Sequence, residues 1–282
     1  NRAARDSAFT KVSGDGVGVT GLVSFHSAGR LLMVGPDPEP IARLAASAAP
    51  LRSAVLLLSG GQDAVSGLTT WRAARGQGAV RGLGGVLRLS LPGDGTGENQ
   101  FDLVLDLCEP PLLGAELPPP GYAAPGTGTQ AQHAALEQLR DLVGDFEKPR
   151  YFEYDPSICA HGMKGTTACR RCIDACPAQA IASLGERVRV EPNLCQGGGA
   201  CATACPTGAM TYGYPPVGDL LERTRRLLAA YREAGGEEAV ILIHDTYAGA
   251  DPAAALSAEA GHVLPLAVEE VASLGLEAWF SA

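Results

Sequence analysis

The sequence predicts a multidomain protein that combines the α+β and α/β fold classes, and three observations lead to this prediction. Glycine-rich turns separate short strand-like segments in the first part of the 282 residues. A cysteine motif occurs twice in the middle, and strand and helix patterns alternate in the last part. We therefore expect a mixed α/β domain over residues 1–128, a helix followed by a cysteine-rich domain over 129–215, and a β-α-β-α unit over 216–282.

The first region is predicted to contain strands around one helix. Apolar and β-branched residues indicate strands at 17–25, 30–34, 54–59, 85–91 and 101–107. A proline followed by several alanines indicates a helix over 40–49. The stretch 110–128 is rich in proline and glycine, so we expect a linker or a loop that lies against the surface.

The middle region begins with a helix and continues into short strands. An apolar stripe at helical spacing predicts a helix over 130–143, and alternation predicts a strand over 150–154. Further strands are expected at 187–190 and at 210–214, the second of them paired with 150–154. Short helices are expected at 169–175 and 201–204.

The last region alternates helices and strands. Helices are predicted over 216–234, 251–259 and 269–280, and strands over 239–244 and 262–268. The first strand is continuously apolar, which is typical of a parallel sheet. Because two strands make a poor free-standing sheet, we expect that the polypeptide continues, or that this unit docks on the N-terminal domain or on a partner.

The cysteine motif of the middle region is an internal duplication. Moving the first copy by 29 residues places Cys172 on Cys201 and Cys176 on Cys205, and it places Pro177 on Pro206. Both copies therefore derive from the run C-x2-C-x2-C-x3-C-P, whose thiolates bind a cuboidal iron–sulfur cluster.

Each copy of the motif lacks one cysteine. In the first copy, Thr166 stands where Cys195 stands in the second. In the second copy, Gly198 stands where Cys169 stands in the first. Cys159 is an obvious substitute in the first copy, at the cost of a longer loop, whereas Gln196 and three glycines offer no substitute ligand in the second.

The pattern closely resembles the bacterial dicluster ferredoxins, and the seven-iron members in particular, over roughly residues 150–214. The resemblance implies a dicluster ferredoxin-like central domain in which the last cysteine of each run binds the cluster of the other run. The ligands implied for cluster one are Cys159, Cys169, Cys172 and Cys205. Those implied for cluster two are Cys176, Cys195 and Cys201. We therefore expect one [4Fe-4S] and one [3Fe-4S] cluster, with two [4Fe-4S] clusters as the alternative.

Two other interpretations of the cysteines are less favourable. Zinc ribbons also use paired C-x2-C, but they do not need a repeated Cys-Pro after a three-residue gap. A disulfide framework is disfavoured because eight cysteines are few for this length and cluster densely. Cys108 lies apart from the others and is expected to be a small buried hydrophobic residue.

Composition restricts the classes of function. The net charge of −9 and the pI of about 5.1 argue against nucleic acid binding and suit docking to a basic redox partner. No apolar run is long enough to span a membrane, and no signal peptide is visible. Cysteines available for clusters fit a reducing compartment, so we expect a cytoplasmic protein.

Three weaker signals are assigned structural roles. The G-x-G-x-x-G match at 16–21 is interpreted as a turn, because strand-like residues follow it where a nucleotide site needs a helix. His244 and Asp245 end a buried strand, and a capping role is favoured over ligand binding. His161 lies in the long loop beside cluster one, where a surface histidine is favoured over one that tunes the cluster.

We therefore hypothesise an electron-transfer protein or subunit that relays single electrons through two clusters. Its partner would be a redox protein or a larger oxidoreductase complex. We expect an electron carrier, or an electron-transfer subunit of an oxidoreductase, in preference to an enzyme, and we assign no catalytic residues. The alternatives are a flavin- or nicotinamide-dependent oxidoreductase whose N-terminal domain binds the cofactor, and a structural or sensing iron–sulfur protein.

Overall fold

The computed structural model describes residues 1–12, 21–58, 65–74, 79–83, 86–90, 99–162 and 168–281. It confirms the predicted mixed α/β character, with helices and several separate sheets. The chain forms two compact units that do not follow chain order. Unit 1 contains Asn1–Leu22, Pro149–Val190 and Gly197–Ala282, and unit 2 contains Val23–Lys148 and Glu191–Gln196. The boundaries of these units differ from those of the predicted domains, which are 1–128, 129–215 and 216–282. Those domain boundaries therefore stay predictions.

Unit 2 is built on a five-stranded parallel sheet. Its strands, in the spatial order β4-β3-β2-β8-β9, are Thr69–Arg72, Arg52–Leu57, Arg30–Gly35, Leu103–Asp106 and Tyr122–Ala123. In this register Leu31 lies beside both Ser53 and Leu103. The strand predicted at 30–34 is confirmed, and the one predicted at 54–59 overlaps β3, although residue 59 lies outside the described ranges. The segment predicted as one strand at 101–107 is divided between β7 (Asn99–Phe101) and β8, because Asp102 interrupts it.

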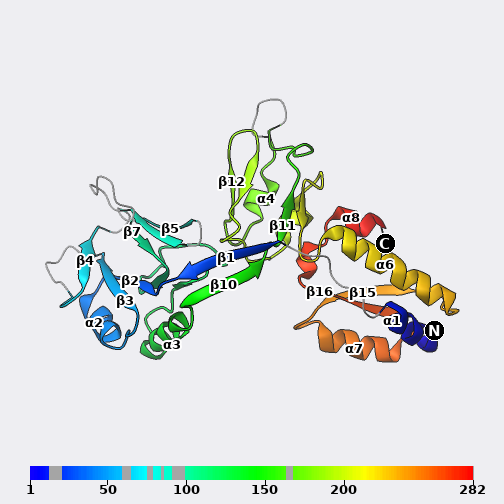
Figure 1. Ribbon diagram of the computed structural model, residues 1–282, viewed down its shortest axis with the longest axis horizontal. Helices are drawn as coiled ribbons and strands as arrows, with labels where there is room; N and C mark the ends of the chain where they lie inside the picture. Colours follow the sequence, from blue (N-terminus) through cyan, green and yellow to red (C-terminus); the bar gives the residue numbers. More distant parts are fainter. Residues whose placement is uncertain are drawn as a thin grey trace. The chain divides into compact units, whose positions relative to one another are not determined.

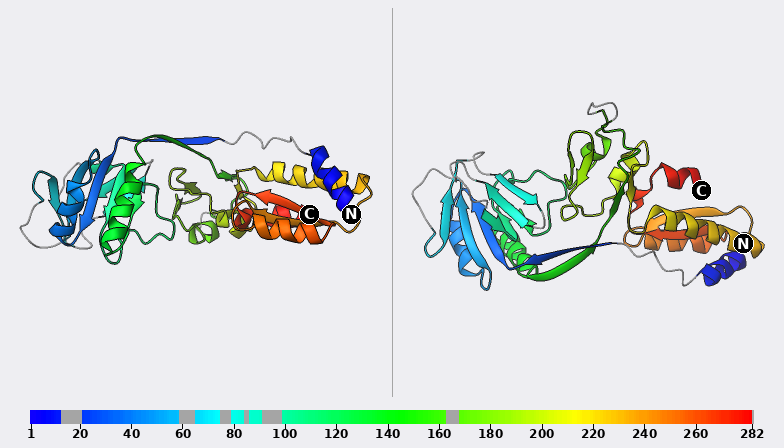
Figure 2. Two further views of the ribbon diagram at one scale, coloured as in Figure 1. Left: turned by 90° about the horizontal axis from the view of Figure 1, so that it is seen from below. Right: turned by 45° about the horizontal axis from the view of Figure 1, so that its top comes forward.

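Alternating residues of the parallel strands divide the core of unit 2 into two layers. Leu31 and Met33 face helices α2 (Pro38–Ala46) and α3 (Thr129–Arg140). Leu32 and Val34 face the other way, in a cluster that includes Leu87 and Phe101 of a small antiparallel sheet. That sheet consists of β5 (Ala79–Leu83), β6 (Val86–Ser90) and β7. Unit 2 therefore has three layers, which are visible in Figures 1 and 2.

The proline- and glycine-rich stretch at 110–128 packs onto the sheet of unit 2. Tyr122 is buried, and its strand β9 pairs with β8. The fully buried carboxylate of Asp106 accepts hydrogen bonds from the amides of Cys108 and Leu112, at 2.9 and 2.7 Å, and from the Tyr122 hydroxyl. Of the two expectations for this stretch, a loop that lies against the surface agrees with the structure better than a linker does.

A two-stranded ribbon combines β1 (Leu22–Ser27) with β10 (Gly144–Pro149). Phe25 and Phe146 stack across it, with ring centroids 5.5 Å apart. The predicted strand at 17–25 overlaps β1, although residues 13–20 lie outside the described ranges. The sequence interpretation did not include β10, whose residues alternate only weakly between apolar and polar.

In unit 1, the two cysteine runs form the same succession of elements. The first run contains α4 (Arg171–Asp174) and β12 (Ile181–Ser183), and the second contains α5 (Ala200–Ala204) and β14 (Met210–Tyr212). β12 pairs with β13 (Val188–Val190), and β14 pairs with β11 (Phe152–Tyr154), both antiparallel. The predicted pairing of 210–214 with 150–154 is confirmed, so the duplication in sequence is also a duplication in structure.

The C-terminal part of unit 1 is a β-α-β unit with helices on both faces. Strands β15 (Val240–Asp245) and β16 (Val263–Val268) are parallel, as predicted, and α7 (Ala250–Glu259) connects them. Helix α6 (Val217–Glu233) packs on the face that carries Ile241 and Leu264 (Figure 1). The helix predicted at 269–280 is confirmed only in its second half, as α8 (Leu276–Ser281); a 3-10 turn at Val271–Ser273 precedes it, and Gly275 lies between them.

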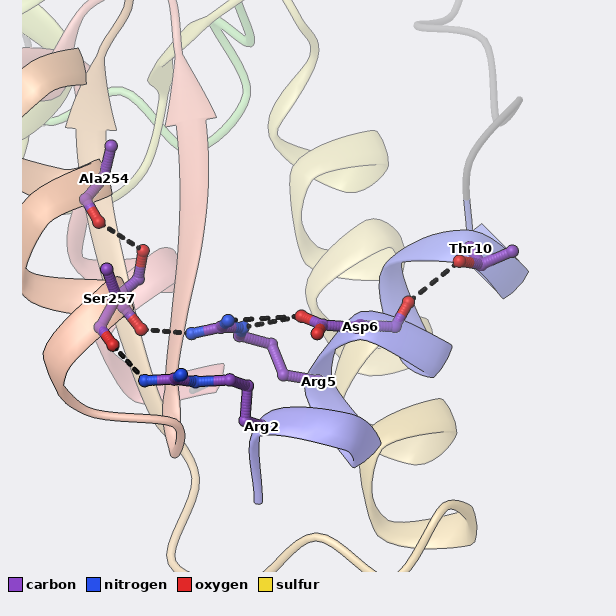
Figure 3. A network of polar contacts seen from close by, with 7 residues as sticks. Arg2, Arg5, Asp6, Thr10, Ala254 and Ser257 are labelled. Atoms are coloured by element: carbon purple, nitrogen blue, oxygen red, sulfur yellow. Dashed lines mark hydrogen bonds and ion pairs between the residues drawn. The ribbon is translucent and has the colours of Figure 1, made fainter.

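Helix α1 (Arg2–Val12) was not predicted and packs on the C-terminal part of the chain. Its small residues Ala4 and Ala8 lie against Tyr231 of α6. Arg2 donates a hydrogen bond to the carbonyl of Ala258, and Arg5 donates one to the carbonyl of Ser257 (Figure 3). These carbonyls end α7, whose last turn has no basic residue of its own, so α1 supplies positive charge at the negative end of that helix.

Within the described ranges, every helix is too short or too polar to cross a lipid bilayer.

Candidate metal centre

Four of the predicted site residues line one small, largely apolar cavity in unit 1. These are the cysteines assigned to cluster one, Cys159, Cys169, Cys172 and Cys205. Cys159 follows β11, Cys169 and Cys172 flank the start of α4, and Cys205 is the C-cap of α5. Three separate chain segments thus bring to one cavity four cysteines that lie up to 46 positions apart in the sequence, from 159 to 205.

The thiols of this cavity affect one another electrostatically. Burial raises the pKa of Cys172 to about 11, and the neighbouring thiolates of Cys205, Cys159 and Cys169 add to the effect. Burial and a hydrogen bond with Cys159 likewise raise the pKa of Tyr154 to about 12. Thiolates crowded into an apolar cavity repel one another, so a positively charged core bound between them would relieve that repulsion.

Backbone amides point at the sulfur atoms of the cavity. The amide of Met210 donates to Cys205 Sγ at 3.4 Å, and that of His161 donates to Cys159 Sγ at 3.5 Å. Burial disfavours the Cys205 thiolate, but hydrogen bonds from Met210, Thr207 and Ala209 outweigh it and lower the pKa of Cys205. Such N–H···S bonds are the interactions that stabilise thiolate ligands and tune their clusters.

His161 is buried, with 1 % of its surface exposed, so the expectation of a surface histidine is wrong. Its Nδ1 lies 2.6 Å from the carbonyl oxygen of Cys169, and its Nε2 lies 2.7 Å from Oγ of Ser183. Both ring nitrogens therefore have partners in the protein. In the sequence, only the nearby Cys159 points to this residue. Its burial could not be predicted, because burial of a loop histidine depends on contacts with distant residues.

The three cysteines assigned to cluster two are described in separate units. Cys176 and Cys201 belong to unit 1, where the amide of Ala180 donates to Cys176 Sγ at 3.3 Å. Cys201 lies in α5. Cys195 belongs to unit 2, where its amide donates to the carbonyl of Glu191 at 3.1 Å. That these three cysteines bind one cluster stays a prediction from their spacing.

Lys148 holds the chain segment around Cys195 in unit 2. Its ammonium group donates to the carbonyls of Asn193 and Cys195, both at 2.7 Å. Burial lowers the pKa of Lys148, while the charges of Cys195 and Glu191 oppose that change. The sequence interpretation missed this residue, because it stands 47 positions before Cys195 in a strand that was not predicted.

Two of the three glycines in the second run have left-handed backbone conformations. Gly197 has φ +77°, and a Cβ there would lie 2.8 Å from the Tyr151 ring. Gly199 has φ +68°, and a Cβ there would lie 2.6 Å from the backbone nitrogen of Ser273. Both positions therefore need glycine. Gly198 does not share the left-handed conformation.

The remaining residues singled out in the sequence have other places. Thr166 and most of the match at 16–21 lie outside the described ranges. Cys108 is buried in the core of unit 2, as expected. Asp245 accepts hydrogen bonds from the amides of Tyr247 and Gly249, at 2.8 and 3.0 Å, which agrees with the capping role. In the described part of the chain, no three His, Cys, Asp or Glu side chains converge as ligands of a single metal ion would.

Comparison with known proteins identifies the repeated region. Residues 167–209 match the model of the 4Fe-4S dicluster domain family. This stretch is therefore a dicluster ferredoxin-type domain within a longer chain, which confirms the resemblance noted in the sequence and supports an iron–sulfur electron-transfer role. No curated protein matches the chain.

Proposed function

We propose that this protein relays single electrons between redox partners through two unlike iron–sulfur clusters. Cluster one is a [4Fe-4S] cluster held by Cys159, Cys169, Cys172 and Cys205. Cluster two is a [3Fe-4S] cluster held by Cys176, Cys195 and Cys201. The observation that carries the proposal is the single cavity lined by all four cysteines assigned to cluster one.

The donor set of this cavity fits a cubane cluster. Each iron at a corner of a cubane takes one thiolate, so four sulfurs must approach from different directions. Here the four thiols come from three chain segments and line a common space. The amides of Met210 and His161 supply hydrogen bonds that thiolate sulfurs need in an apolar surrounding.

When bound, such clusters accept and release one electron at a time with little change in structure. The protein's own contribution is to keep the surroundings rigid and dry. Ala209 and Met210 are buried beside the thiols and exclude water from them. The antiparallel pairs β11·β14 and β12·β13 fix the segments that carry the cysteines. Rigid ligands reduce the rearrangement that accompanies each electron transfer.

The [3Fe-4S] assignment rests on the second run of the motif. Gln196 and Gly198 provide no thiolate where a fourth cysteine is expected. A cubane with three protein ligands is stable without its fourth iron. If another ligand completes the site, two [4Fe-4S] clusters result instead.

The partner of such a carrier is a redox protein or a larger oxidoreductase complex. The net charge of −9 favours a partner with a basic docking surface. Ligand cysteines that must stay reduced favour the cytoplasm as the compartment.

A second candidate function follows from the sheet of unit 2. The strand order reverses between β2 and β8, and in parallel sheets ligands bind at the carboxyl ends of the strands at such a point. A cavity of about 430 Å³ lies there, lined by residues that include Pro36, Asp37 and Cys108. This placement favours a flavin or nicotinamide that donates electrons to the clusters.

The chemistry of that cavity is less suited to a nucleotide. Phosphate binding at a helix start needs free amides and no negative charge. Helix α2 begins with Pro38 and Pro40, which lack amide protons, and Asp37 and Glu39 are acidic. The carrier without a bound nucleotide is therefore the preferred proposal.

The test is spectroelectrochemistry of the purified protein under anaerobic conditions. A relay shows reversible one-electron reduction of both clusters and no absorbance bands of a bound flavin. Clusters that cannot be reduced reversibly would instead indicate a structural or sensing role. A retained flavin or nicotinamide would favour the enzyme.

A further inference from the structure

The loop between the first two ligands of cluster one is much longer than in the repeated motif. Nine residues separate Cys159 from Cys169, whereas the compact motif has two between its first cysteines. A longer loop has more conformations to lose when it binds a cluster. Something in the protein must hold the two ends of this loop together.

His161 contacts both ends of the loop. Its amide donates to Cys159 Sγ at 3.5 Å, and its carbonyl accepts from the amide of Ala168 at 2.9 Å. Its ring lies 2.6 Å from the carbonyl of Cys169. One buried residue thus joins the segment before the loop to the segment after it.

The ring of His161 also ties the loop to the β12–β13 hairpin. A carbonyl can only accept, so Nδ1 of His161 carries the proton in its bond to Cys169. In the neutral ring Nε2 then accepts from the hydroxyl of Ser183, at 2.7 Å. Oγ of Ser183 in turn accepts from the amide of Gly185, at 3.3 Å. The hydrogen bonds form one directed chain from the hairpin to the ligand segment.

Gly162 gives independent evidence that the start of the loop lies against the same hairpin. A Cβ at this position would lie 1.8 Å from the backbone oxygen of Glu186. Glu186 is in the turn that joins β12 to β13. The backbone at Gly162 therefore touches the hairpin directly, and no larger residue fits between them.

We propose that His161 is a positioning residue for cluster one, which with Gly162 clamps the extended Cys159–Cys169 loop onto the β12–β13 hairpin. The clamp replaces the geometry that the short C-x2-C spacing provides in the repeated motif. This inference rests on the proposed function, since it assumes that Cys159 and Cys169 are ligands. It adds a residue outside the cysteine pattern that determines whether cluster one persists.

Two isosteric variants separate the two ring contacts of His161. In His161→Asn the amide nitrogen takes the place of Nδ1 and keeps the bond to Cys169, but contact with Ser183 is lost. In His161→Gln the amide reaches the place of Nε2 and keeps Ser183, but contact with Cys169 is lost. His161→Ala removes both. His26→Ala is the matched control, because the His26 side chain is 66 % exposed.

The experiment measures iron release from the full-length, cluster-loaded protein in the presence of a chelator, with EPR before and during release. We expect His161→Ala to lose cluster one at least about ten times faster than the unchanged protein, the factor that one buried hydrogen bond contributes. Because the clamp needs both ring contacts, His161→Asn and His161→Gln should each release cluster one faster than the unchanged protein and more slowly than His161→Ala. The signal of cluster two and the lifetime in His26→Ala should not change.

The outcomes distinguish the clamp from the proposed function. If the unchanged protein binds no iron, the proposed function fails. If it binds both clusters and His161→Ala releases cluster one at the original rate, the clamp is wrong and the function stands. Equal loss of both clusters in all three variants, with altered circular dichroism, would also contradict the clamp, because it would show general unfolding.

Gly162→Ala tests the second half of the clamp without changing a hydrogen-bonding side chain. We expect it to shorten the lifetime of cluster one as His161→Ala does, while Gly218→Ala, whose added Cβ meets no atom within 4 Å and whose backbone is not left-handed, serves as its control in the same unit. An unchanged lifetime in Gly162→Ala would overturn the proposed contact with Glu186.

Discussion

The two cysteine runs have the same order of secondary-structure elements, but they differ in the residues that complete their proposed ligand sets. Both place a short helix and then a strand at corresponding positions, α4 with β12 and α5 with β14. The first run has an enlarged spacing between Cys159 and Cys169, and His161 near its start is buried. The second has a glycine segment held against Tyr151 and Ser273. The comparison teaches that the paired strands carry the duplication, while the segments between the cysteines carry the differences between the two proposed ligand sets.

The strongest test of this comparison removes the last cysteine of one run, which we expect to bind the cluster of the other run. Cys205 belongs to the second run, but Cys205→Ala is expected to remove the fourth ligand of cluster one. The [4Fe-4S] signal in EPR of the reduced protein should be lost, while the [3Fe-4S] signal of the oxidised protein remains. Loss of the [3Fe-4S] signal alone would show that the runs do not exchange ligands.

Restoring the missing cysteine should make the two sites alike. Gly198→Cys introduces a thiolate at the position that corresponds to Cys169, and its backbone lacks the left-handed conformation of Gly197 and Gly199. We expect the three-iron site to gain about one iron per chain and to lose its oxidised EPR signal. Gly198→Ala is the matched control and should keep the three-iron signal. An unchanged signal in Gly198→Cys would contradict the alignment of the runs.

The glycines of the second run test how tightly its backbone is packed, and this test does not involve cluster ligands. In Gly199→Ala the new Cβ would overlap the backbone of Ser273, whereas in Gly208→Ala it would meet nothing within 4 Å. Both residues have φ near +70°, at +68° and +69°. The left-handed backbone costs about 1–2 kcal/mol in either variant, and Gly199→Ala should lose at least about 1 kcal/mol more. Urea unfolding measures both, and equal losses would argue against close packing at Gly199.

The smallest expected effect concerns the two polar residues that support the ligand segments. His161 bears on the first run through hydrogen bonds, while Lys148 places a positive charge near Cys195. A positive charge favours the reduced cluster. Lys148→Met should therefore lower the reduction potential of cluster two by tens of millivolts and leave cluster one unchanged.

Lys11→Met is the control for this measurement, because Lys11 is exposed and pairs with Glu233 away from the cysteines. Protein-film voltammetry resolves the two clusters. A shift in both potentials, or a shift in neither, would contradict the assignment of Lys148 to the segment of Cys195.

The sequence predicted the repeated domain well because its signals are local. The cysteine spacing placed α4 and α5, and apolar runs placed β15 and β16 together with their parallel pairing. Helix α3 was placed in the same way, by its apolar stripe. In each of these segments the residues that define the element are neighbours along the chain.

The features that the sequence did not reveal depend on distant contacts. Helix α1 buries only small residues such as Ala4 and Ala8, and its stability comes from Tyr231 and from the end of α7. The burial of His161 depends on Ser183, which lies 22 residues away. Lys148 is another example, since its partner carbonyls lie beyond the first cysteine run. A propensity or a spacing does not encode contacts of this kind.

The predicted helix at 269–280 shows a local pattern overruled by side-chain hydrogen bonding. The carboxylate of Glu270 accepts from the amide of Ala272 at 2.9 Å, and Oγ of Ser273 donates to the Glu270 carbonyl at 2.5 Å. These bonds favour a short 3-10 turn over a continuous helix. Gly275 then separates this turn from α8.

The most direct test of two unlike clusters is quantitation of iron and sulfide in anaerobically purified protein, combined with EPR after oxidation in air. The account predicts about seven irons per chain and an oxidised [3Fe-4S] signal. About eight irons without that signal would contradict the three-cysteine assignment. Protein without iron, or with zinc in its place, would contradict the proposed electron relay itself.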